Sequence, residues 1–300
     1  MPKFARRLMF TLEMIKFEHS VFALPFALTG ALLAFRETGF HVPEWPWILF
    51  WIVVAMVSAR SAAMAFNRVI DSEIDGRNPR TSMRHIPAGH LSSKFAWVFV
   101  ALTSFLFLIA ARELNSLCFI LAPIALAVVF FYSFTKRFTS FSHIVLGFAL
   151  GIAPAAAWIA VRGSLSPAIL WLTAAVTLWT AGFDIIYSCQ DFQFDTNENL
   201  FSLPRRVGLA PALLIARALH IGMIVCLLAL SFALQLGALS LLGIAAVAAL
   251  LIYEHSLVSP RDFSRVNAAF FTMNGWVSVL FFCFWAADIL FLRPPYVPVH

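Results

Sequence analysis

Residues 46–66 read "PWILFWIVVAMVSARSAAMAF", and residues 67–75 continue with "NRVIDSEID". The first stretch is apolar and long enough to cross a bilayer, whose hydrocarbon core needs about 20 such residues in a helix. The second stretch places Asn67, Asp71 and Asp75 four residues apart. Side chains at that spacing lie on one face if the helix continues beyond residue 66. We therefore expect a membrane helix that ends in a row of polar side chains.

The whole chain is apolar, which indicates an integral membrane protein. It has 300 residues, of which 61% are hydrophobic, and a mean hydropathy of +0.87. One soluble core of this length cannot bury so much apolar material. No run alternates as barrel strands do, so we predict one all-α domain over residues 1–300 with nine transmembrane helices. The predicted spans are 20–36, 46–66, 95–111, 116–134, 142–161, 167–188, 208–232, 236–255 and 269–291.

The distribution of Lys and Arg predicts the orientation, because cytoplasmic connections carry an excess of these residues. In one set of alternate connections, the only Lys or Arg residues are Arg36, Arg112, Arg162 and Arg293. The other set contains most of the remaining basic residues and is predicted to be cytoplasmic. It comprises the N-terminus and residues 67–94, 135–141, 189–207 and 256–268. The polar N-terminus does not resemble a cleavable signal, so we expect the first span to be retained.

A second acidic cluster follows the sixth predicted span. Asp184, Asp191 and Asp195 lie in "DIIYSCQDFQFD", with spacings of seven and four. Four predicted spans separate this cluster from the first, so both must face the same side of the membrane. Neighbouring carboxylates repel one another, and hard oxygen ligands without Cys or His suit Mg²⁺. Mg²⁺ completes its coordination with water and phosphate oxygens, so the two clusters predict a diphosphate site.

Basic residues accompany both acidic clusters and favour a phosphate ligand, with which Arg pairs well. Arg60 lies inside the second span, seven residues before Asn67, and is expected to face a polar cavity. The other basic residues are Arg77, Arg80, Arg84, Lys136, Arg137, Arg205 and Arg206.

Two other classes of membrane protein also carry aspartates. A divalent-cation transporter would use intramembrane carboxylates, but here they lie near one interface, and the basic residues do not suit a cation path. A CDP-alcohol phosphotransferase would carry the pattern DG-x2-AR, which is absent.

The motifs resemble those of the UbiA-type intramembrane prenyltransferases, which join an isoprenoid diphosphate to an aromatic acceptor. The family's NDxxDxxxD stands here as "NRVIDSEID", and its DxxxxxxDxxxD as "DIIYSCQDFQFD". Further similarity lies in "NPRTSMRHIPAG" at 78–89 and "YSFTKR" at 132–137. The resemblance covers essentially the whole chain. It implies a UbiA-like bundle with its active site on the cytoplasmic side, in a bacterial inner membrane.

The resemblance also implies roles for individual residues. Metal ligands would be Asn67, Asp71, Asp75, Asp184, Asp191 and Asp195, of which Asp71, Asp75, Asp191 and Asp195 are the expected catalytic residues. Diphosphate contacts would come from Arg84, Tyr132 and Lys136. Arg60 and Arg137 would bind the acceptor. The expected cofactor is Mg²⁺, and the expected partners are a polyprenyl diphosphate, a small aromatic acid and the lipid bilayer, with no nucleic acid.

Two departures from the family pattern bear on chemistry. Arg68 occupies the place of the first motif Asp, which removes a negative charge from the cluster and adds a positive one. Before the first span, "KFEHSVFALPFA" replaces the R-x-D-K-P pattern of many 4-hydroxybenzoate enzymes. Together with "FNRVIDSEIDGRNPRT" and "FDIIYSCQDFQFD", this stretch looks more like the branch of the futalosine route to menaquinone, whose acceptor is a dihydroxynaphthoate. The sequence leaves two acceptors possible: 4-hydroxybenzoate, for ubiquinone biosynthesis, and 1,4-dihydroxy-6-naphthoate, for menaquinone biosynthesis. Glu18 and His19 are candidate contacts for the acceptor.

Overall fold

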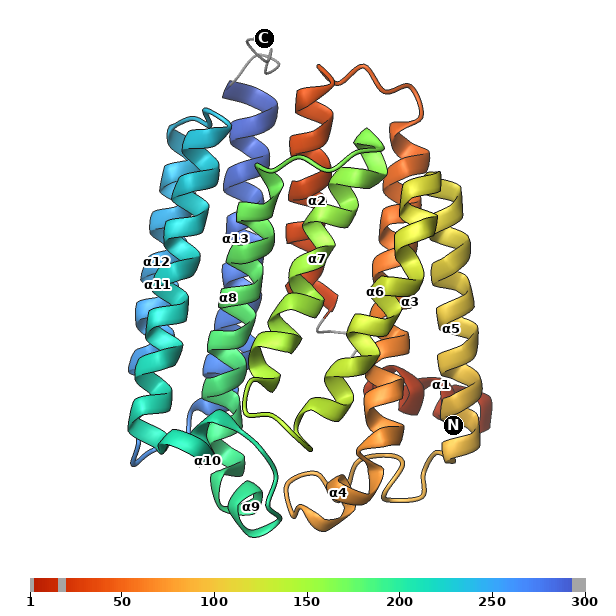
Figure 1. The fold of residues 1–300 in the computed structure, drawn as a ribbon, viewed down its shortest axis with the longest axis vertical. Coiled ribbons are helices and arrows are strands. Elements are labelled where there is room, and N and C mark those ends of the chain that lie inside the picture. Colours follow the sequence, from red (N-terminus) through yellow and green to blue (C-terminus); the bar gives the residue numbers. More distant parts are fainter. Residues whose placement is uncertain (1–2, 16–19, 293–300) are drawn as a thin grey trace.

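The computed structural model describes residues 3–15 and 20–292, and within these ranges the protein is helical with no β-strand. The long helices run along a common direction, and the short helices α4, α9 and α10 gather at one end of the bundle (Figure 1). The elements are α1 (Lys3–Met14), α2 (Ser20–Glu37), α3 (Trp45–Ile70), α4 (Ser72–Arg77), α5 (Ser93–Leu114), α6 (Ser116–Thr135), α7 (Ser142–Arg162), α8 (Ile169–Ser188), α9 (Phe192–Asn197), α10 (Leu203–Val207), α11 (Leu209–Ala233), α12 (Ala238–Ser256) and α13 (Asn274–Ala287). A 3-10 turn (Cys189–Asp191) follows α8, and π-helical turns (Ala268–Met273 and Asp288–Leu292) flank α13.

The predicted spans correspond closely to these helices. Among the described residues, eight helices are long and apolar enough to cross a membrane, and they match the second to ninth predicted runs. The first run corresponds to α2, an 18-residue helix that packs in the bundle. The count of nine spans and the cytoplasmic side stay predictions. Lys16, Glu18, His19 and Arg293 lie outside the described residues.

The polar ends of α3 and α8 differ from the continuous helices that the spacing argument assumed. Helix α3 ends at Ile70 and α4 begins at Ser72, with Asp71 between them. The backbone N–H of Asp75 still donates to the carbonyl of Asp71 at 2.7 Å, as in a helix. After α8, the 3-10 turn leads into α9, so Asp184, Asp191 and Asp195 lie on three successive elements. The side chains gather through these short turns rather than along one straight helix.

Large aromatic side chains form the centre of the bundle. Phe26 of α2 stacks on Phe281 of α13 with ring centroids 4.7 Å apart, and it also contacts Trp179 of α8 at 5.0 Å. Trp158 and Trp285 are buried in the same core. Many outward-facing side chains are apolar as well, as expected for a surface in contact with lipid.

Glycines let α7 approach its neighbours closely. A Cβ added at Gly147 would lie 2.2 Å from the carbonyl oxygen of Thr177 in α8, and one at Gly151 would lie 2.2 Å from the Thr177 hydroxyl. On α2, a Cβ at Gly30 would lie 2.3 Å from the carbonyl oxygen of Pro154. Small residues allow such backbone contact between membrane helices. Helix α7 is therefore fixed against both α2 and α8.

Adding a methyl group at this contact is expected to destabilise the bundle. In Gly147→Ala the new Cβ meets backbone that cannot move aside, and overpacking of this kind costs about 1–3 kcal/mol. Thermal unfolding in detergent is the measurement, and we expect a lower midpoint for this variant. Gly76→Ala is the matched control, since its nearest neighbour would be the Pro87 Cβ at an ordinary 3.7 Å. Equal midpoints for both variants would contradict the packing argument.

Candidate functional site

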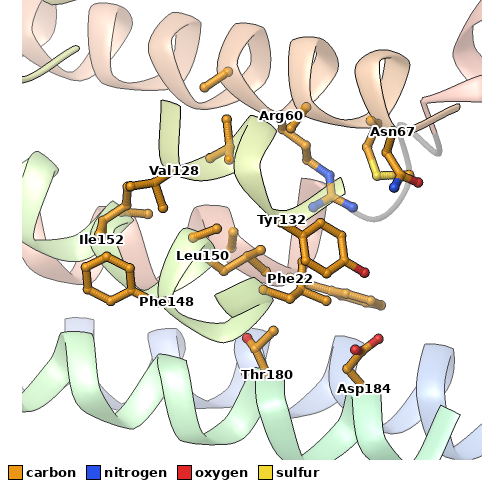
Figure 2. A pocket seen from close by; sticks show the side chains of 18 of the residues that line it. Phe22, Arg60, Asn67, Val128, Tyr132, Phe148, Leu150, Ile152, Thr180 and Asp184 are labelled. Atoms are coloured by element: carbon orange, nitrogen blue, oxygen red, sulfur yellow. The ribbon is translucent and has the colours of Figure 1, made fainter. Parts of the chain in front are cut away.

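A cavity of about 1100 Å³ lies within the bundle and reaches the end where α4 and α9 lie. Its size is slightly above the usual range for ligand sites. Figure 2 shows Arg60, Asn67, Tyr132 and Asp184 on one side of it, and apolar side chains such as Phe148 on the other. The predicted site residues that line it are Arg60, Asn67, Asp71, Asp75, Arg84, Tyr132, Lys136, Asp184, Asp191 and Asp195. Arg137 is not among the lining residues.

Asp75 has two guanidinium groups beside it. Arg84 donates from Nη1 to both carboxylate oxygens of Asp75, at 2.5 and 2.6 Å. The Nη1 of Arg68 lies 4.0 Å from Asp75 Oδ2. Asp75 is only 6% exposed, and a carboxylate buried to this degree needs such partners. Arg68, at the position of the missing motif Asp, thus lies within the site and adds positive charge to it.

Asp71 is bound by the side chains of Asn67 and Arg137. Asn67 Nδ2 donates to Asp71 Oδ2 at 2.8 Å, and Arg137 Nη2 lies 3.1 Å from Asp71 Oδ1. Burial raises the pKa of Asp71, and the charges of Arg137 and Lys136 oppose that rise only in part. Arg137 also donates to the carbonyls of Ser133 and Ile70. Its guanidinium is therefore engaged behind Asp71 rather than in the cavity.

Asp191 joins the two segments that carry the acidic clusters. Arg80 binds it in a bidentate manner, from Nε at 2.9 Å and from Nη2 at 2.5 Å, and Asn78 Nδ2 donates to it at 3.1 Å. Burial alone would lower the pKa of Arg80, but the hydrogen bond and charge of Asp191 outweigh it, and the pKa is raised. These contacts connect residues 67–94 with residues 189–207. The prediction that both clusters lie at the same end of the bundle is confirmed.

Lys136 carries a positive charge among the aspartates. Burial by itself would lower its pKa, but the charges of Asp195, Asp184 and Asp191 outweigh this effect, and the pKa is raised. Asp195 is 2% exposed. Its Oδ2 has no hydrogen-bond partner among the residues that the structure describes. A buried carboxylate oxygen without a donor is one that a cation is suited to bind.

His143 is a site residue that the sequence did not reveal. Its Nδ1 lies 2.6 Å from Asp184 Oδ2, and its Nε2 accepts from the backbone N–H of Leu203 at 3.5 Å. Because Nε2 is an acceptor, Nδ1 carries the proton and donates to Asp184. His143 begins a predicted span 41 residues before Asp184, and no local spacing relates them. Only the packing of α7 against α8 brings them together.

The residues at the polar end fit Mg²⁺. Among the described residues, no group of three His, Cys, Asp or Glu side chains is close enough to enclose a metal by itself. Mg²⁺ does not require such a group, because it commonly takes one or two carboxylates and fills its remaining positions with water and phosphate oxygens. The donors here are hard oxygens, and Asp195 Oδ2 is buried without a partner. This set suits an ion that is held together with a phosphate ligand.

Comparison with known proteins identifies the family. Residues 23–287 match the model of the UbiA prenyltransferase family. The chain is 31% identical over 244 residues to 4-hydroxybenzoate octaprenyltransferase of Vibrio atlanticus, covering 79% of this chain and 85% of that protein. It is 32% identical over 267 residues to the protein of the same name from Methylococcus capsulatus, covering 88% and 89%.

Solved structures show the same fold. A UbiA homologue from Aeropyrum pernix K1, determined without ligand, superimposes with a TM-score of 0.81 at 32% identity, covering 91% of this chain and 98% of that one. A UbiA homologue from Archaeoglobus fulgidus bound to GPP and Mg²⁺ has a TM-score of 0.69 at 19% identity, covering 93% and 99%. The family match favours an enzyme over the cation transporter that the aspartates alone left open. The chain belongs to the UbiA prenyltransferase family.

Proposed function

We propose that this prenyltransferase uses Mg²⁺ to transfer a polyprenyl group from its diphosphate to a carboxylated phenol at the cytoplasmic side of a bacterial inner membrane. The acceptor is 4-hydroxybenzoate or 1,4-dihydroxy-6-naphthoate. The observation that carries the proposal is a cavity that has aspartates and cations suited to a diphosphate at one end. The guanidinium of Arg60, seven residues before Asn67 on α3, lines the same cavity and points towards Tyr132 (Figure 2). The curated relatives named 4-hydroxybenzoate octaprenyltransferase support the first acceptor.

The polar end would bind the diphosphate. Arg84, Lys136 and the hydroxyl of Tyr132 line it and provide donors to phosphate oxygens, and Arg68 supplies a further positive charge. Bound Mg²⁺ would withdraw negative charge from the leaving diphosphate. Its ligands would come from Asn67, Asp71, Asp75, Asp184, Asp191 and Asp195.

The reaction replaces a C–O bond by a C–C bond. The bond between C1 of the prenyl chain and the diphosphate oxygen breaks, and its electron pair leaves with the diphosphate, which Arg84 and Lys136 stabilise. A ring carbon beside the acceptor's hydroxyl attacks C1 and then loses its proton. That proton would pass to Asp71, whose pKa is raised by burial.

Arg60 is better placed than Arg137 to bind the acceptor's carboxylate. Arg60 lines the cavity, forms no ion pair within the described parts of the chain, and has a buried Nε without a hydrogen-bond partner. A cation at this depth in a membrane helix calls for an anion. Arg137 already binds Asp71 and lies outside the lining. The acceptor's carboxylate would thus meet Arg60 while its ring faces C1 of the donor.

The direct test is turnover by the purified protein in nanodiscs with Mg²⁺, a polyprenyl diphosphate and one acceptor at a time, with products identified by mass spectrometry. We expect a prenylated product from at least one acceptor, and none after chelation of the metal. No product from either acceptor in the presence of Mg²⁺ would overturn the proposal.

Loss of a carboxylate from either cluster is expected to abolish most of the activity. Asp71→Asn removes the proposed base and Asp191→Asn removes the partner of Arg80, so we expect turnover to fall by roughly 100-fold or more in each. Asp262→Asn is the control, since Asp262 is fully exposed and outside the cavity. Rates equal to those of the control in both variants would rule out the two-cluster site.

Arg60→Met should weaken binding of the acceptor alone. A hydrogen bond to a charged group is worth about 1.5–3 kcal/mol, so the KM for a carboxylated acceptor is expected to rise about tenfold or more while the KM for the donor stays the same. Steady-state kinetics with each substrate varied in turn provide the measurement. The matched variant Arg137→Met should leave the acceptor KM near the wild-type value. The reverse pattern would assign the acceptor to Arg137.

His143→Leu should affect catalysis through Asp184. Loss of the N–H that orients Asp184 is expected to raise the Mg²⁺ concentration for half-maximal rate by about tenfold or more, as for other groups that orient metal ligands. His143→Asn offers an N–H donor and should recover part of the loss. Unfolding midpoints measured alongside separate this effect from a general loss of stability. An unchanged Mg²⁺ dependence in His143→Leu would refute it.

A further inference from the structure

We propose that three buried side chains outside the cavity position its polar end. They are Trp179 of α8, Glu254 of α12 and Asn274 of α13, and we call them the Asn274 network. None of them is among the described residues that line the cavity. The network acts on Arg80, the partner of Asp191, through a π-helical turn and an aromatic contact. This inference rests on the proposed function, because its consequence is the binding of the donor's diphosphate.

Asn274 lies at the centre of the network. The indole Nε1 of Trp179 donates to Asn274 Oδ1 at 2.8 Å. An indole N–H is a donor only, so this contact decides which end of the amide is the oxygen. Nδ2 then faces three acceptors, which are the carbonyls of Phe270 and Ala269, at 3.0 and 3.3 Å, and Oε1 of Glu254, at 3.3 Å. The three network side chains are fully buried.

The two carbonyls belong to the π-helical turn that precedes α13. This turn spans Ala268–Met273. In a π-helical turn each N–H bonds to the carbonyl five residues back, so its hydrogen bonds are out of step with those of a regular helix, and such turns are frequent at functional sites. By donating to two of its carbonyls, Asn274 holds the turn in one place. Trp179 and Glu254 in turn tie the amide to α8 and α12.

The turn contributes two aromatic rings to the cavity. Phe270 and Phe271 are both lining residues. The Phe270 ring centroid lies 4.1 Å from that of Tyr187 and 5.2 Å from that of Phe183. The Phe271 centroid lies 6.0 Å from that of Tyr187. Side chains packed at such distances do not move independently, so the position of the turn sets the position of the Tyr187 ring.

Tyr187 connects these rings to the ion pair at the polar end. Its hydroxyl accepts from Arg80 Nη1 at 3.1 Å, and the guanidinium carbon of Arg80 lies 5.2 Å from the ring centroid, within reach of a cation–π contact. The same guanidinium binds Asp191 through Nε and Nη2. A displaced Tyr187 ring therefore disturbs the contact between Arg80 and Asp191. Because both residues line the cavity, this loss of order weakens the site for a diphosphate with Mg²⁺.

Inorganic diphosphate with Mg²⁺ is the probe, because it occupies the polar end without an isoprenoid tail. Asn274→Leu removes every contact of the amide, and Phe270→Leu removes the ring next to Tyr187. We expect the Kd of the probe, measured by calorimetry in nanodiscs, to rise about tenfold in each variant, since groups that orient metal ligands have effects of this size. Steady-state kinetics should show an unchanged KM for the acceptor, whose proposed partner Arg60 lies on α3.

Ser240→Ala is the matched control for a loss of stability alone. It removes an equally buried hydrogen bond, between the hydroxyls of Ser240 and Ser231 at 2.9 Å, at the opposite end of α12 from Glu254. Its unfolding midpoint should fall while its Kd for the probe stays at the wild-type value. A wild-type Kd in both Asn274→Leu and Phe270→Leu would overturn the proposal, because the network would then support the fold only.

Substitutions of Glu254 test the network with the amide intact. Glu254→Gln keeps an acceptor for Asn274, and Oε2 of Glu254 has no partner among the described residues that the change could remove. This variant should bind the probe as the wild type does, whereas Glu254→Leu should bind it more weakly. Tyr187→Phe removes the hydroxyl bound to Arg80, and its combination with Glu254→Leu should raise the Kd by less than the product of the two single fold-changes. Effects of independent sites multiply in this measure, so a full product would overturn the path through Tyr187.

The outcomes separate this inference from the proposed function. Calorimetry with the probe does not require turnover, and product formation by the wild type does not involve the variants. If the wild type forms product and the network variants bind the probe as the wild type does, only the network proposal fails. If the wild type forms no product from either acceptor, the proposed function fails.

Discussion

The bidentate contact between Arg80 and Asp191 is the interaction on which the site depends. It connects two segments that are 111 residues apart in the chain, and it does so at the end of the bundle where neither segment is held by a long helix. Asp191 is buried, and a buried carboxylate is costly unless it is well bonded. Asn78 donates to Asp191, and Arg80 also donates to the hydroxyl of Tyr187. The contact between Arg80 and Asp191 thus links the two segments that carry the acidic clusters at one end of the cavity.

Three other aspartates also have partners. Asp71 has Arg137 and Asp75 has Arg84 and Arg68, whereas Asp184 contacts the imidazole of His143. The guanidinium groups that balance buried carboxylates are also groups that attract a diphosphate, so the stability of this end and its ligand preference have one origin. Arg68 illustrates the point, because the family motif has Asp at this position and the guanidinium brings an extra positive charge next to Asp75.

The apolar part of the cavity depends on asymmetric packing around α7. Glycines on α7 and α2 bring backbones into contact and make two sides rigid. Towards α6, α7 presents residues that line the cavity, such as Phe148 and Ile152. One helix thus packs firmly against two neighbours and lines the cavity with the rest of its circumference.

By itself, the sequence determined the helical class, the positions of the spans, and the sharing of one end by the two acidic clusters. These features follow from local properties: the length of apolar runs, a spacing of four residues, and an even number of crossings. Only the tertiary structure decided which cation each aspartate meets, that Arg137 lies behind Asp71 while Arg60 faces the cavity, that His143 orients Asp184, and that α3 is interrupted at Asp71. Those pairings join residues that are tens of positions apart, and they are set by how the helices pack, which no local pattern in the chain records.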